Sequence, residues 1–84
     1  MKLTVYSSTW CPDCRQAQAF LEEFGVEYEL IEIDTDPEAA VRLERETGNR
    51  GIPYFVIDDE RWVRAYVPKR GFDRAGMMEV LELG

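Results

Sequence analysis

The chain has 84 residues, 45% of them hydrophobic and 12% aromatic, which is enough to bury the core of one domain over residues 1–84. Its net charge of −7, from 17 acidic and 10 basic residues, argues against nucleic-acid binding. No apolar run approaches membrane-spanning length, and the first residues carry a strand pattern rather than a targeting leader. We therefore expect a cytoplasmic, monomeric protein with no nucleic-acid or membrane partner.

The first part of the chain predicts a strand followed by a helix. Leu3 and Val5 alternate with polar residues, which indicates a short strand over residues 2–6. Apolar residues then recur at the spacing of one helical face, and Gly25 ends this pattern. The residues of this face are Ala17, Phe20, Leu21 and Phe24.

A second strand and a second helix follow. The strand is expected over residues 28–33. The helix is expected over residues 37–47, because Asp36 is a suitable N-cap before Pro37 and Gly48 a suitable end. The order strand, helix, strand, helix is typical of a parallel α/β unit.

The last third of the chain has a different pattern. Two strands are expected, over residues 54–57 and 61–67, and so short a link between them forces an antiparallel hairpin. Asp73 can cap a final helix, with Met77 and Leu81 on its inner face.

The cysteines Cys11 and Cys14 are the only two in the chain, and they stand between the first strand and the first helix. A helix N-terminus offers unpaired N–H groups and a positive dipole end, both of which favour a thiolate at Cys11. Pro12 suits the first helical position. Cys11 would attack a disulfide and Cys14 would resolve the mixed disulfide. Trp10 could shield the site or offer an apolar docking surface, whereas Asp13 adds negative charge near the thiolate.

Other uses of a cysteine pair are less consistent with this sequence. A closed zinc site needs about four ligands, whereas the chain has two cysteines and no histidine, so no metal site is expected. A structural disulfide would close a very small loop in a chain with no sign of secretion. An iron–sulfur cluster shared between two chains stays open as an alternative. Pro12 disfavours it, because proline stiffens the loop and has no N–H to offer a cluster sulfur.

The order of elements resembles the minimal thioredoxin fold, and the length resembles glutaredoxins. This resemblance implies an α/β fold, β-α-β-α-β-β-α, with a four-stranded mixed sheet flanked by three helices. The segment Gly51-Ile52-Pro53 is similar to the Thr-Val-Pro segment of glutaredoxins. It implies a cis bond before Pro53 and an Ile52 backbone that lies beside the active sulfur, ready to pair with a substrate strand.

Further residues resemble the glutathione site of glutaredoxins. Gly71 and Asp73 match part of a Gly-Gly and Asp pattern that holds the γ-glutamyl end of glutathione, although Phe72 departs from it. Asp73 is equally well explained as an N-cap. Arg50 matches a basic residue that contacts a glutathione carboxylate, or is simply exposed at a helix end. Trp10 is more like thioredoxins, and Asp13 replaces a tyrosine common between glutaredoxin cysteines.

The resemblance implies a thiol–disulfide oxidoreductase that acts on disulfide-containing proteins or small-thiol mixed disulfides. Cys11 and Cys14 would be catalytic, and the substrate would contact Trp10, Pro12, Arg50, Ile52, Pro53, Gly71 and Asp73. Exchange requires no cofactor; glutathione, another small thiol or a flavoprotein disulfide reductase would supply electrons. Two alternatives remain. One is a redoxin reduced by thioredoxin reductase that serves an enzyme such as ribonucleotide reductase, and the other is a dimeric iron–sulfur cluster-binding module.

Overall fold

The computed structural model describes residues 1–83 and is built around a four-stranded mixed sheet in the order β2-β1-β3-β4. The first strand, β1 (Leu3–Ser7), pairs in parallel with β2 (Glu29–Glu32) and antiparallel with β3 (Tyr54–Ile57). The edge strand β4 (Arg61–Arg64) pairs antiparallel with β3. This topology confirms the predicted fold class.

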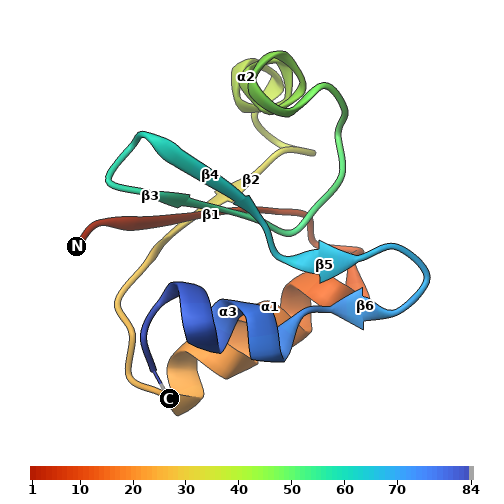
Figure 1. The fold of residues 1–84 in the computed structure, drawn as a ribbon. Coiled ribbons are helices and arrows are strands. Elements are labelled where there is room, and N and C mark those ends of the chain that lie inside the picture. Colours follow the sequence, from red (N-terminus) through yellow and green to blue (C-terminus); the bar gives the residue numbers. More distant parts are fainter. Residues whose placement is uncertain (84) are drawn as a thin grey trace.

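Three helices cover the two faces of the sheet (Figure 1). The helices α1 (Pro12–Glu23) and α3 (Arg74–Val80) lie on one face, and α2 (Pro37–Thr47) lies on the other. Successive side chains of β1 point to opposite faces of the sheet, and both faces are covered, so all five residues of β1 are buried. Leu3, Val5, Ala17, Phe20, Leu21, Phe55 and Met77 pack on the α1 side, and Tyr6, Ala39, Leu43 and Val56 on the α2 side.

The ends of α2 are those that the sequence predicts. The Asp36 carboxylate accepts a hydrogen bond from the Ala39 N–H at 3.2 Å. Gly48 adopts a left-handed conformation with φ 87° and ends the helix. Over residues 1–83, no helix is both long and apolar enough to cross a membrane.

The expected strand over residues 61–67 is wrong in its second half. It ends at Arg64, because β3 begins only after Pro53, which has no N–H with which to continue the ladder. The buried Ala65 instead donates its N–H to the Pro53 carbonyl at 3.1 Å and accepts from the Asp73 N–H at 2.9 Å. The chain therefore turns away from the sheet at Ala65. The β2 strand is also one residue shorter at each end than predicted.

Beyond Ala65 the chain forms a small hairpin that the sequence did not predict. Its strands β5 (Tyr66–Val67) and β6 (Gly71–Phe72) pair only with each other. Figure 1 shows the hairpin beside the N-terminal end of α1, with its loop projecting away from the rest of the fold. The β5–β6 hairpin thus lies next to the segment that carries the two cysteines.

Candidate active site

Cys11 is the N-cap of α1, and its sulfur accepts a hydrogen bond from the Cys14 N–H at 3.2 Å. Pro12 is the first helical residue, where its missing N–H costs nothing. The unpaired backbone groups and dipole of this helix end therefore converge on the Cys11 sulfur. Cys11 is only 5% exposed, and its exposed part faces a surface groove. A ligand therefore reaches Cys11 from the groove side.

Cys14 lies in a different environment on the inner side of the same turn. It is fully buried, and both cysteines are unpaired. Burial raises the pKa of the Cys14 thiol to about 12, and its hydrogen bond with the Cys11 sulfur adds to this shift. Cys14 therefore stays protonated at neutral pH. The two sulfurs therefore lie in unequal environments, because Cys11 lines the groove and Cys14 is enclosed.

Ser7 is a residue of this site that the sequence analysis missed. It ends β1 and is 1% exposed. The Ser7 hydroxyl and the Ser8 backbone N–H lower the pKa of Cys14, although burial outweighs both. The available signal was its position, because a hydroxyl at the end of a buried strand, four residues before Cys11, can lie beneath the first helical turn.

An open groove of about 590 Å³ runs over the Cys11 sulfur and is lined by residues 10–13, 50–52 and 66–71. Trp10 is 69% exposed on one wall. Ile52 lines the groove, whereas Pro53 behind it is fully buried. The Ile52–Pro53 peptide bond is cis, as the resemblance implied. Segments distant in sequence thus meet around one sulfur.

The charged residues of the groove are one acid, Asp13, and three bases. Arg50 forms an ion pair with Glu44 at 2.8 Å, but both side chains are more than half exposed, so the pair holds Arg50 only weakly. The other two bases, Lys69 and Arg70, come from the β5–β6 hairpin.

The predicted residues of a glutathione site are only partly brought together. Arg50 and Gly71 line the groove, but Asp73 does not. The Asp73 carboxylate instead accepts a hydrogen bond from the Gly76 N–H at 3.0 Å and caps α3. In this structure Asp73 therefore acts as the N-cap of α3.

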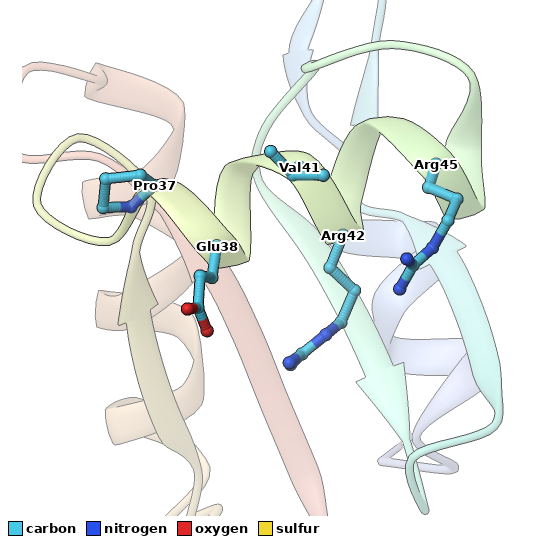
Figure 2. Close-up of a pocket in the computed structure, with 5 residues that line it drawn as sticks. All are labelled: Pro37, Glu38, Val41, Arg42 and Arg45. Atoms are coloured by element: carbon cyan, nitrogen blue, oxygen red, sulfur yellow. The ribbon is translucent and has the colours of Figure 1, made fainter.

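A second pocket lies on the far side of the fold, along α2, and is lined by Pro37, Glu38, Val41, Arg42 and Arg45 (Figure 2). It contains neither cysteine nor any other predicted site residue. Among residues 1–83, no group of three or more histidine, cysteine or acidic side chains is arranged to hold a metal ion.

The sheet order and the dithiol at the start of α1 define a small redoxin of the thioredoxin fold. A family model described as glutaredoxin matches residues 3–62. A glutaredoxin of Pseudomonas aeruginosa is 30% identical over 79 residues, which cover 94% of this chain and 93% of that protein. The chain belongs to the glutaredoxin family.

The glutaredoxin-like protein NrdH of Escherichia coli is also similar. Its sequence is 34% identical over 62 residues, which cover 74% of this chain and 75% of that protein. The solved structure of NrdH-redoxin from the same organism superimposes with a TM-score of 0.75 at 26% identity, and the match covers 95% of each chain. That structure is described as the basis for a thioredoxin-like activity profile.

The unequal environments of the two cysteines predict unequal alkylation. Near neutral pH, iodoacetamide should label one cysteine of the native reduced chain, Cys11, because Cys14 is buried and its pKa is raised to about 12. Denaturant should make both react. Peptide mapping by mass spectrometry measures the two sites. Comparable labelling of Cys14 in the native chain would contradict the assignment.

Asp73 is predicted to stabilise α3 as its N-cap. Asp73→Ala should lower the free energy of unfolding by about 1 kcal/mol, whereas Asp73→Asn, which keeps an acceptor, should cost much less. Urea unfolding measures both. An Asp73→Ala variant as stable as the parent would refute the capping role. A raised KM for a glutathione mixed disulfide in the stable Asp73→Asn variant would instead indicate a contact with glutathione.

Proposed function

We propose that this protein is a dithiol–disulfide oxidoreductase that reduces protein disulfides or small-thiol mixed disulfides. The observation that carries the proposal is the Cys11 sulfur at the N-cap of α1. It accepts the Cys14 N–H at 3.2 Å beside a buried thiol whose pKa is about 12. A nucleophile and a protonated resolving thiol are the two groups that this reaction needs.

In the first step, the Cys11 thiolate attacks one sulfur of the substrate disulfide. A bond forms between that sulfur and the Cys11 sulfur, the substrate S–S bond breaks, and the leaving thiolate takes a proton from solvent. The helix end stabilises the anion before attack. The product is a mixed disulfide with neutral sulfur at Cys11.

In the second step, Cys14 loses its proton to solvent and attacks the Cys11 sulfur. The Cys11–Cys14 disulfide forms and the second substrate thiol leaves, so that two electrons have passed from the protein to the substrate. Burial is the largest cause of the raised Cys14 pKa, but hydrogen bonding to Cys11 and the Cys11 charge also raise this pKa in the free enzyme. Both causes end once Cys11 is in a mixed disulfide. Cys14 therefore becomes easier to ionise when it is needed, assisted by Ser7.

The groove would hold the substrate during these steps. Ile52 would offer backbone groups to an extended substrate strand, with Pro53 behind it fixing its direction. Trp10 and Pro12 would provide apolar contact beside the sulfur. Arg50, Gly71 and Asp73 remain the proposed contacts for a small thiol such as glutathione, with Asp73 the least favourably placed because it caps α3.

The oxidised protein must be reduced again by two electrons, and no cofactor is required in the chain itself. A flavoprotein disulfide reductase of the thioredoxin reductase type is the favoured source. The 34% identical Escherichia coli NrdH has a thioredoxin-like activity profile, and Asp73 lies outside the groove. Glutathione or another small thiol is the alternative. Continued turnover needs reducing surroundings, which agrees with a cytoplasmic location.

Variants of the two cysteines should fail at different steps. Cys11→Ser should abolish disulfide reduction, because no nucleophile faces the groove. Cys14→Ser should form a stable mixed disulfide with a protein substrate, because the resolving thiol is gone. Non-reducing gel electrophoresis and intact mass measure the adduct. Equal activity in the two variants would overturn the role assignment.

A coupled assay identifies the electron source. NADPH oxidation is followed with hydroxyethyl disulfide as substrate, either with thioredoxin reductase alone or with glutathione and glutathione reductase. We expect turnover in the thioredoxin reductase arm and none in either arm for Cys11→Ser. Turnover confined to the glutathione arm would assign the small thiol as reductant. No turnover in either arm, with stoichiometric reduction by the dithiothreitol-reduced protein, would indicate a different electron donor.

A further inference from the structure

The β5–β6 hairpin packs against two parts of the groove, the segment around Gly51 and the first turn of α1. A Cβ added to Gly51, two residues before the cis-proline, would collide with the Tyr66 hydroxyl. A Cβ added to Gly71 would lie 3.0 Å from the nearer Asp13 carboxylate oxygen, in the first turn of α1. Glycine at both positions lets the hairpin approach closely. The hairpin is therefore a wall of the groove.

The hairpin gives the groove a charge opposite to that of the protein. The whole chain carries −7, but the groove lining has three basic side chains against the single acid Asp13. Within residues 1–83, neither Lys69 nor Arg70 takes part in an ion pair. Two uncompensated positive charges on the rim of a reactive groove attract a negatively charged ligand.

The turn holds these two charges in a defined place. The Arg70 N–H donates to the Val67 carbonyl at 2.9 Å and closes the turn. Lys69 adopts φ 69°, a left-handed conformation that is unusual for a residue other than glycine. At the base, Arg64 stacks over the Tyr66 ring at 5.3 Å. The hairpin is thus an ordered element that carries its charges in its loop.

We propose that Lys69 and Arg70 bind an acidic stretch of the polypeptide that carries the disulfide to be reduced. The partner is a protein whose reducible cysteine is flanked, within a few residues, by aspartate or glutamate. This inference rests on the proposed function and specifies its substrate class. It adds the β5–β6 hairpin as the element that selects the substrate.

The placement of the charges favours a polypeptide over a small disulfide. The reactive sulfur is recessed in the groove, whereas the loop that carries Lys69 and Arg70 projects from the body of the fold (Figure 1). A ligand that contacts both must extend along the groove, as a peptide strand does. The match to the family model ends at residue 62, before the hairpin, so that match assigns Lys69 and Arg70 no role.

The test uses two synthetic peptides with the same internal disulfide, flanked either by glutamates or by glutamines. The protein is reduced beforehand and freed of reductant, and the single-turnover rate with each peptide is measured by chromatography. A second arm measures binding of the same peptides, with serine in place of cysteine and a fluorescent label, by anisotropy. Hydroxyethyl disulfide, which has no charge, reports the chemistry alone.

The matched variants remove two positive charges each. Lys69→Gln with Arg70→Gln changes the hairpin, and Arg45→Gln with Arg61→Gln changes two exposed basic residues outside the groove. Both double variants have the same net charge, so a difference between them reports position rather than the overall field. Thermal unfolding confirms that each variant is folded.

We expect the glutamate peptide to bind and react between about threefold and tenfold better than the glutamine peptide, since exposed ion pairs are individually weak. The preference should disappear in the hairpin variant and persist in the control variant. It should also shrink as salt rises from roughly 0.05 M to roughly 0.5 M, where charges are screened over a few ångströms. These results together would support the proposal.

Other outcomes overturn it. Equal binding and rates for the two peptides, a preference that survives in the hairpin variant, or equal loss in both variants would each refute docking at the hairpin. If glutathione disulfide, tested as a further substrate, reacted faster with the parent than with the hairpin variant while the two peptides reacted equally, the charges would be reassigned to a small thiol. Preferential binding that depends on the hairpin, without reduction of any disulfide, would support the docking surface and refute the proposed function. Reduction of both peptides at equal rates would support the proposed function and refute docking at the hairpin.

Discussion

The site depends on one hydrogen bond, from the Cys14 N–H to the Cys11 sulfur at 3.2 Å. A cysteine at this N-cap does what a serine or aspartate does in other helices, because its side chain pairs with a backbone donor that the helix leaves free. The same contact places the sulfur in the positive electrostatic potential at the N-terminus of α1. The capping interaction that starts α1 is thus also the interaction that would prepare the proposed nucleophile, and moving the helix start by one residue would remove both.

The burial of β1 determines the other half of the dithiol. Because both faces of β1 are covered, its last residue, Ser7, is already inside the protein where the chain turns into α1. Cys14 follows on the inner side of the first turn and loses contact with water, which raises its pKa. The two cysteines therefore differ because one faces the groove and the other faces the sheet.

The sequence predicted features whose cause is local and missed those whose cause is tertiary. Asp36 and Gly48 delimit α2 by their own backbone preferences, and the spacing of apolar residues places α1. The hairpin depends on a bond between Ala65 and Pro53, residues far apart in sequence, so the pattern of residues 61–67 still predicted one strand. Ser7 was missed because its importance comes from burial beside Cys14. The roles of the groove residues depend on a ligand and remain predictions.

The hairpin also explains how reactivity and selectivity can be separated in so small a protein. The hairpin packs closely against its neighbours at Gly51 and Gly71, where a side chain would displace Tyr66 or press on Asp13. Glycine at positions 51 and 71 therefore allows the hairpin to pack beside the dithiol and the cis-proline segment. The side chains of the loop residues Lys69 and Arg70 are exposed and form no ion pair within residues 1–83. Under the proposed function, changes in the loop would alter which disulfide is held without altering the sulfur that attacks it.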